Sequence, residues 1–288
     1  MQDLIYVYQQ QPWLLFLLVG LVSLCIGSFL NVVIYRLPVM LERQWQQEAK
    51  YVLNGEESES EEMFNLAIPN SSCPKCQSPI KAWQNIPVIS YLLLRGKCAN
   101  CKEAISSRYP LVEAATAVAC LLLLLQFGMG WQFIAMWGLT LVFIALIGID
   151  FDTQLLPDSL TLPLLWLGLL INTQTLFVPL LDAVWGAAAG YLFLWCIFWA
   201  FKLATGKDGM GYGDFKLMAV CGAWFGWQVL PNIILLSSAV GAVVGLALIV
   251  INGRDSQKPM PFGPFIAIAA WLSILYPQWF TVMNWLPV

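Results

Sequence analysis

The sequence predicts an all-α protein that crosses a lipid bilayer about eight times, with one polar region after its first helix. Three observations predict this fold class: the composition, the spacing of the apolar stretches and the distribution of basic residues. Of the 288 residues, 59% are hydrophobic and only 11% are charged, whereas soluble domains contain about 25% charged residues. The mean hydropathy is +0.72. Most of the chain is therefore expected to lie in a membrane.

The charge composition excludes several classes of function. The sequence contains no histidine, which excludes a Ser-His-Asp triad and a His-ligated zinc enzyme. The 14 Lys and Arg residues and 17 Asp and Glu residues give a net charge of −3, without the basic surplus expected of a nucleic-acid-binding protein. The size of the chain and the placement of its 8 Cys exclude a small secreted disulfide scaffold.

Eight apolar stretches approach the length of about 20 helical residues that crosses a hydrocarbon core. They are residues 13–35, 110–128, 131–149, 160–178, 180–201, 215–230, 232–252 and 262–286. The stretch 215–230 is short and meets Pro231, which predicts a helix that is tilted, kinked or partly lined by water. The first stretch has no basic leader and no small-residue cleavage site, so we expect a retained span.

Every basic residue lies in one of three loops, 36–109, 202–216 and 253–258. With eight spans, these loops fall on the same side of the membrane, and the positive-inside rule makes that side cytoplasmic. Both termini are then expected on the opposite side. The predicted organisation is a first span at 1–35, a cytoplasmic region at 36–109 and a seven-span region at 110–288.

The cytoplasmic region contains an acidic run at residues 56–62. Such a run is typical of a solvated loop or helix end. Alternatively, it attracts a basic peptide.

Two C-x-x-C pairs in the cytoplasmic region predict a zinc site formed by Cys73, Cys76, Cys98 and Cys101. Each pair can form a knuckle turn that offers two thiolates, and two knuckles complete a tetrahedral shell. A closed shell leaves no position for substrate, so we expect the zinc to be structural. The alternatives are thiols without metal or a redox pair, and a cytoplasmic location disfavours stable disulfides.

The other four cysteines lie singly in apolar stretches and are predicted to be packing residues. They are Cys25, Cys120, Cys196 and Cys221.

Two aspartates at span ends are the main catalytic candidates, because ionisable residues at membrane depth are costly and usually functional. Asp150 closes the third predicted span, and Asp214 precedes the sixth. The topology places both on the cytoplasmic side. Two carboxylates that meet in a partly dry site can share one proton, so that one activates water while the other protonates a carbonyl. This pattern predicts aspartyl proteolysis.

Each acidic residue also has a structural interpretation. Asp214 follows a glycine run and can cap a helix, and Asp158 is expected to cap the fourth span. Asp152 would face away from Asp150 on a helix but could line the same site in an extended turn. Glu113 either pairs with a basic residue or lines a cavity. Gly209, Gly211 and Gly213 are expected to let a substrate strand approach Asp214.

Several motifs together resemble those of a known family. Gly211-Tyr212-Gly213-Asp214 resembles the G-x-G-D signature of intramembrane aspartyl proteases, and together with the surroundings of Asp150 it resembles the bacterial type IV prepilin leader peptidases. The resemblance covers nearly the whole chain. It includes residues 27–38, the four-cysteine loop, residues 108–113 and residues 259–264.

The resemblance implies a bifunctional enzyme of the bacterial inner membrane. Such enzymes cleave the basic leader of type IV prepilins and type II secretion pseudopilins after a glycine, and then N-methylate the new N-terminus with S-adenosylmethionine. Asp150 and Asp214 match the catalytic pair of the family, and the four cysteines match its zinc ligands. The implied partners are these substrates and the lipid bilayer, and no nucleic acid is implied.

The residues that bind S-adenosylmethionine are not predicted. The chain has no G-x-G-x-x-G motif after a strand, so the methyl donor would bind between the region 36–109 and nearby helix ends. Asn31, Arg36 and Gly96 are nearby but carry no specific signal. Two other hypotheses remain: a peptidase without methylation, and a transporter in which Asp150 and Asp214 bind protons or cations.

Overall fold

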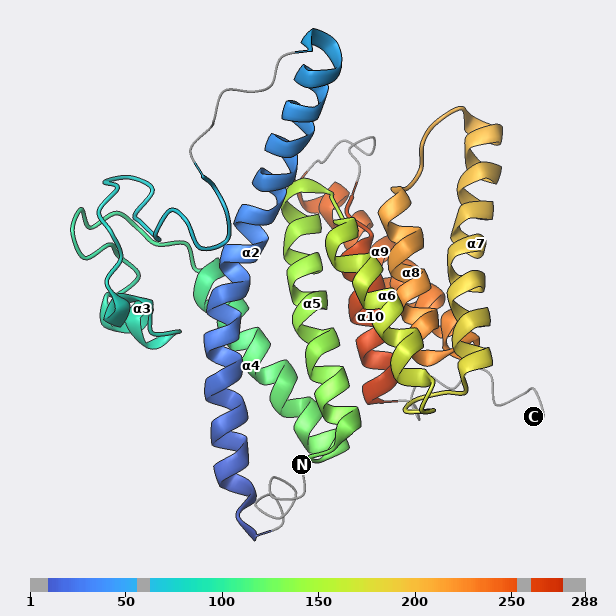
Figure 1. Cartoon of the computed structure of the whole chain (residues 1–288), viewed down its shortest axis with the longest axis horizontal. Helices are drawn as coiled ribbons and strands as arrows, with labels where there is room; N and C mark the ends of the chain where they lie inside the picture. The colour runs from blue at the N-terminus through green and yellow to red at the C-terminus, as the bar shows by residue number, and fades with distance from the viewer. Residues whose placement is uncertain (1–9, 56–62, 253–259, 277–288) are drawn as a thin grey trace. The chain divides into compact units, whose positions relative to one another are not determined.

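The structure is a computed structural model that describes residues 10–55, 63–252 and 260–276. Within these ranges it is built of helices and loops, with only isolated β-bridges (Figure 1). The chain divides into two compact units, residues 1–145 and 146–288. The acidic run 56–62, both termini, and Arg254 and Lys258 lie outside the described residues.

Unit 1 consists mainly of α2 (Pro12–Asn54), α4 (Arg108–Phe127) and the first part of α5 (Trp131–Thr153). Two short helices, η1 (Ala82–Asn85) and α3 (Ile89–Leu93), lie in the chain between α2 and α4. The backbones of α2 and α4 approach closely at Gly27, where a Cβ would lie 2.9 Å from the Cα of Glu113. A small residue at this point therefore lets the two apolar helices pack directly.

Helix α2 extends well beyond the end predicted at residue 35. It continues through Pro38 to Asn54 and ends at Gly55, whose φ of +67° closes it in the left-handed conformation. Its last part is polar and carries hydrogen bonds between residues four apart, Gln46–Glu42 and Gln44–Glu48. The first apolar stretch is thus only the N-terminal half of one long helix.

The described residues of unit 2 form the end of α5 and five further α-helices. These are α6 (Asp158–Asn172), α7 (Leu180–Thr205), α8 (Tyr212–Phe225), α9 (Leu230–Asn252) and α10 (Gly263–Leu275), with the 3-10 turn η2 (Trp227–Val229) before α9. Helix α8 packs against α6, α7 and α10, and its residues from Leu217 to Phe225 are buried. The glycine pair Gly186 and Gly222 brings α7 and α8 into backbone contact.

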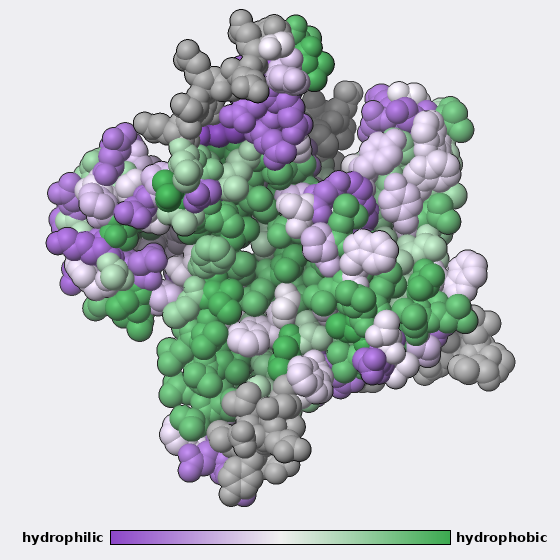
Figure 2. Space-filling model, viewed as in Figure 1, coloured by the Kyte–Doolittle hydropathy of each residue, from purple (hydrophilic) through white to green (hydrophobic). Residues whose placement is uncertain are grey.

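The all-helical membrane fold is confirmed, but the count of eight spans is not. Five helices among the described residues are long and apolar enough to cross a membrane: α2, α4, α5, α7 and the η2–α9 segment. Helices α6 and α10 are apolar but shorter. In Figure 2 hydrophobic residues cover the visible flank of α2, and hydrophilic residues gather at its C-terminal end.

Two predicted helix ends were wrong for identifiable reasons. Helix α6 ends at Asn172 rather than at residue 178, because the buried Asn172 side chain donates to the carbonyls of Ala223 and Trp224 and accepts from the N–H groups of Phe177 and Val178. Helix α8 ends at Phe225 rather than at residue 230, because Gly226 adopts a φ of +81°.

Candidate functional site

Asp150 and Asp214 lie close together within unit 2. Asp150 is near the C-terminal end of α5, and Asp214 is the third residue of α8. Their exposed fractions are 4% and 6%, and the two carboxylates interact electrostatically. The fold therefore brings together two buried acidic groups that are separated by 64 residues of sequence, as the sequence predicted.

The Asp150 carboxylate is held by the start of a third helix. Its Oδ2 accepts a hydrogen bond of 3.0 Å from the backbone N–H of Gly263, the first residue of α10. A Cβ at Gly263 would lie 2.7 Å from that same oxygen. Glycine is therefore required here for close approach. From the sequence alone, Gly263 was recognised only as part of residues 259–264, one of the motifs that carry the family resemblance.

Leu156 fills the space beside both aspartates. This buried side chain contacts Gly213 and Gly263, where added Cβ atoms would lie 2.7 Å from its Cβ and 3.1 Å from its Cδ1, respectively. At Gly209 the corresponding space is taken by Phe201. Of the three glycines expected to admit substrate, only Gly211 has room for a Cβ, which would lie 3.7 Å from Oδ2 of Asp214.

Asp158 and Asp214 are not N-cap residues, since the N-caps of α6 and α8 are Pro157 and Gly211. The Asp214 carboxylate does accept a hydrogen bond from the backbone N–H of Gly211, so it also helps to hold the start of α8. Asp158 instead forms a bidentate ion pair with Lys216, at 2.6 and 2.7 Å. This ion pair joins the first turns of α6 and α8. Asp158 lies two residues after Leu156, and Lys216 lies two residues after Asp214.

Asp152 does not share the buried environment of Asp150. It is exposed, although it lies only two residues further along α5. The helix continues to Thr153, so residues two apart, such as Asp150 and Asp152, point to nearly opposite sides of it, as the helical interpretation predicted.

The four predicted zinc ligands converge in unit 1. The sulfur atoms of Cys73, Cys76, Cys98 and Cys101 all lie within 4.8 Å of one another. The Cys73 and Cys101 sulfurs are 3.8 Å apart, which matches the separation of about 3.8 Å that Zn–S bonds of about 2.3 Å give in a tetrahedron.

The two C-x-x-C pairs adopt the same turn. In each, the residue after the second cysteine has positive φ and donates its N–H to the carbonyl of the first, from Gln77 to Cys73 and from Lys102 to Cys98. The N–H of each first cysteine in turn donates to the carbonyl five residues later. The backbone is thus shaped as two matching knuckles.

The local electrostatics also suit a cation. Hydrogen bonds from the Ser78 side chain and backbone lower the pKa of Cys76 to about 5, and backbone groups of Cys101 and Asn100 lower the pKa of Cys98. At Cys101 a hydrogen bond from the Glu103 backbone lowers the pKa, but desolvation and hydrogen bonds with the other three cysteines outweigh it and raise the pKa to about 11. A metal ion bound here would compensate the charge of four thiolates held this close together.

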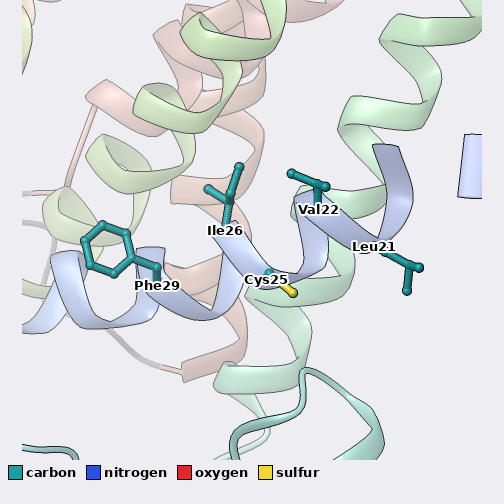
Figure 3. Close-up of a pocket in the computed structure, with 5 residues that line it drawn as sticks. All are labelled: Leu21, Val22, Cys25, Ile26 and Phe29. Atoms are coloured by element: carbon teal, nitrogen blue, oxygen red, sulfur yellow. The ribbon is translucent and has the colours of Figure 1, made fainter. Parts of the chain in front are cut away.

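The remaining four cysteines differ in their exposure. Cys120 and Cys221 are buried, as predicted for packing residues. Cys25 and Cys196 are exposed on α2 and α7, so they do not pack within their units as expected. Cys25 lines a shallow apolar hollow of about 410 Å³ with its α2 neighbours Leu21, Val22, Ile26 and Phe29 (Figure 3). This lining carries no charged group suited to acid–base chemistry.

Two residues tie the four-cysteine region to the helices, and a third joins two helices. The Arg36 guanidinium on α2 donates to the carbonyls of Asn65, Leu66 and Pro69. Asn31 joins α2 to α4, because it donates to the carbonyls of Gly27 and Tyr109. Glu113 was predicted either to pair with a basic residue or to line a cavity. In the structure it accepts a 2.7 Å hydrogen bond from the N–H of Val88. Gly96 has a φ of +67° and packs against Tyr91. These contacts are structural and identify no site for a methyl donor.

Comparison with known proteins gives consistent matches along the chain. The model of the bacterial peptidase A24 N-terminal domain matches residues 21–127, and that of the type IV leader peptidase family matches residues 137–246. No solved structure matches the chain.

Several curated relatives are called prepilin leader peptidase/N-methyltransferase. The relative from Aeromonas salmonicida is 55% identical over 267 residues, and that from Aeromonas hydrophila is 56% identical over 266 residues, each covering 92% of both chains. The relative from Pseudomonas aeruginosa is 54% identical over 256 residues, which are 89% of this chain and 88% of the relative.

Proposed function

Since the chain belongs to the type IV leader peptidase family, we propose that it is a bifunctional membrane enzyme. It cleaves the basic leader of type IV prepilins and type II secretion pseudopilins after a glycine, and it then N-methylates the new N-terminal residue. The observation that carries the peptidase activity is the buried pair Asp150 and Asp214. The methyltransferase activity is supported by the names of the relatives.

The paired carboxylates supply the groups needed for peptide hydrolysis without histidine or metal. The ionised member takes a proton from water, and the water oxygen attacks the scissile carbonyl. The protonated member donates its proton to the carbonyl oxygen, which gives a neutral tetrahedral intermediate. Transfer of a proton to the amide nitrogen then breaks the C–N bond and releases the leader with a new carboxylate.

Burial of the pair supports this role. Two like charges held close in a site of low dielectric cannot both ionise easily, so one shared proton is the favoured state. The Gly263 N–H fixes one oxygen of Asp150, and Leu156 fills the space beside both residues. The carboxylates are therefore oriented before substrate arrives, which reduces reorganisation during the reaction.

The membrane topology suits this substrate class. We place the active site at the cytoplasmic face of the inner membrane and both termini in the periplasm, because the basic residues cluster in loops of one side. A prepilin is an apolar helix with a cationic leader on the cytoplasmic side. Its scissile bond would then lie at the level of the cytoplasmic ends of α5 and α8.

We assign the four cysteines to a structural zinc ion. Bound zinc would hold the two knuckles together and stabilise a region with few buried apolar residues. S-adenosylmethionine would supply the methyl group, and the region 36–109 is proposed to contribute to its site.

The test is a cleavage assay with a purified prepilin in detergent or vesicles, with and without S-adenosylmethionine, read by mass spectrometry. Loss of the leader, together with a gain of one methyl mass only when the donor is present, supports both activities. Leader loss without methylation would leave a peptidase alone. An intact prepilin would contradict the proposal and return attention to the transport hypothesis, which the family match does not favour.

A further inference from the structure

A group of large apolar side chains is exposed in unit 1 between the two cysteine knuckles. It lies on η1 and α3 and in the turn between them, and we call it the 83–93 surface. Its members and their exposed fractions are Trp83 50%, Ile86 43%, Ile89 52%, Leu92 67% and Leu93 70%. Figure 2 shows a hydrophobic patch at this edge of the four-cysteine region, where Figure 1 draws α3. A cluster of this kind normally has a partner.

The position of the 83–93 surface relative to the membrane follows from one hydrogen bond. Val88, the residue before α3, donates its N–H to Glu113 at 2.7 Å. Glu113 is the sixth residue of α4, a candidate membrane span that begins at Arg108. At about 1.5 Å per residue, Glu113 lies roughly 8 Å along that helix. Figure 1 shows α3 near the level at which α4 begins, far from the C-terminal end of α2.

The charges around the 83–93 surface are almost all positive. Exposed Lys81, Arg95 and Lys97 flank it, and the whole segment 63–108 contains six Lys or Arg residues and one acidic residue, Glu103. Glu103 is 3.6 Å from Lys75. A basic rim of this kind attracts an anionic partner and repels a cationic one, such as the leader of a prepilin.

We propose that the 83–93 surface is a membrane anchor that inserts into the interface of the cytoplasmic leaflet, with Lys81, Arg95 and Lys97 bound to anionic phospholipid headgroups. Trp and branched aliphatic side chains are typical of segments that lie in this interface. Basic residues next to them add attraction to the negatively charged leaflet. The segment then lies on the membrane without crossing it, and it holds the four-cysteine region against the bilayer.

The lipid contact can be tested independently of the proposed function, because the readout is labelling by lipid and neither leader cleavage nor methylation is measured. The full chain is placed in vesicles of phosphatidylethanolamine and phosphatidylglycerol that contain a phospholipid with a photoactivatable diazirine in its acyl chain. After illumination and trypsin digestion, labelled peptides are identified by mass spectrometry. Trypsin cuts after Lys81 and Arg95, so the surface is recovered as the single peptide 82–95.

The control region is the polar end of α2. Peptide 44–50, between Arg43 and Lys50, belongs to the part of α2 that continues beyond the predicted span, and it should remain unlabelled. Strong labelling of 82–95 with none of 44–50 is the expected result. Equal labelling of both peptides, or labelling of neither, would overturn the anchor.

Matched variants test the residues themselves. Leu92→Glu with Leu93→Glu is expected to reduce labelling of peptide 82–95 several-fold, while the zinc content per chain stays the same. Val52→Glu with Leu53→Glu, at two positions that are 81% exposed near the end of α2, should leave that labelling unchanged. Unchanged labelling in the first variant would refute the assignment of these side chains.

The lipid composition tests the basic rim. Labelling of 82–95 is expected to fall when phosphatidylglycerol is replaced by phosphatidylcholine, and equal labelling would refute the role of anionic headgroups. If prepilin, added to the vesicles, removed the label from 82–95 competitively, the surface would be a substrate-docking site and the anchor would be rejected.

Discussion

Substitution of Gly263 by alanine perturbs the candidate active site without removing an acidic group. The added Cβ would lie 2.7 Å from Oδ2 of Asp150 and 3.1 Å from Cδ1 of Leu156. Neither neighbour is the free end of an exposed chain, because both residues are buried. We therefore expect the Asp150 carboxylate to rotate or shift away, which weakens its 3.0 Å hydrogen bond from the Gly263 N–H.

The size of the effect follows from that hydrogen bond. A hydrogen bond to a charged group contributes about 1.5–3 kcal/mol, and about 1.4 kcal/mol corresponds to a tenfold change in rate. If the aligned carboxylate is needed in the transition state, Gly263→Ala should lower kcat for leader cleavage by about 10-fold to about 100-fold. KM should change less, because Gly263 is not a residue that we infer to contact the substrate.

The assay is single-turnover cleavage of a prepilin in vesicles, with Gly138→Ala as the matched control. Gly138 lies on α5, the helix that carries Asp150, but has no atom within 4 Å of an added Cβ, so this variant should cleave at the rate of the unchanged chain. Full activity of Gly263→Ala would refute the role given to the Gly263 contact. An equal loss of cleavage rate in both variants would show that the effect is not specific to the Gly263 contact.

Three further predictions test other contacts. Lys216→Asp should slow leader cleavage by about fivefold or less, because exposed ion pairs contribute at most about 1 kcal/mol. Adding Asp158→Lys reverses the ion pair and should restore part of the lost rate. No recovery in the double variant would contradict a role for this ion pair. Cys98→Ser should lower bound zinc below one ion per chain in elemental analysis, whereas Cys25→Ser should not; a full zinc complement in the first would exclude the four-cysteine shell. Glu113→Ala removes the acceptor of the part-buried hydrogen bond from the Val88 N–H and should cost about 1–3 kcal/mol of stability, seen as a lower melting temperature in detergent. Glu113→Gln retains an acceptor oxygen and should lose less, and equal losses would argue against this hydrogen bond.

The candidate site was largely predictable because its acidic residues stand out in an apolar sequence. Asp150 and Asp214 are ionisable groups at the ends of apolar stretches, where their cost requires a function, and the distribution of basic residues placed both on one side. The four cysteines were equally recognisable from their spacing. In each case a local pattern carried the information, and the fold then brought the groups together.

Contacts that depend on the approach of separate helices were not predictable. The Gly263 N–H reaches Asp150 across 113 residues, and Lys216 reaches Asp158 across 58. Neither separation has a periodicity that a single sequence reveals. The same holds for Asn172, whose apolar neighbours predicted a continuing helix although its amide group ends α6 by bonding to α8. Hydropathy indicates which residues leave water, but it does not indicate where buried polar groups find their partners.

The length of α2 shows a different limit. A stretch that crosses a membrane is recognised by where its hydrophobicity stops, and this predicted an end at residue 35. The helix instead continues to Asn54 in polar sequence, because its backbone hydrogen bonds do not need lipid once a helix has been nucleated. The boundary of a span and the boundary of its helix are therefore separate predictions.

The central claim, that Asp150 and Asp214 act as one catalytic pair, is tested most directly by Asp150→Asn and Asp214→Asn in the prepilin cleavage assay. Asparagine preserves the shape of each side chain but cannot exchange the shared proton. We predict that each substitution alone abolishes leader removal while bound zinc is retained, and that both together cause no further loss, because the residues act as a unit. Cleavage that survives either substitution would contradict the account.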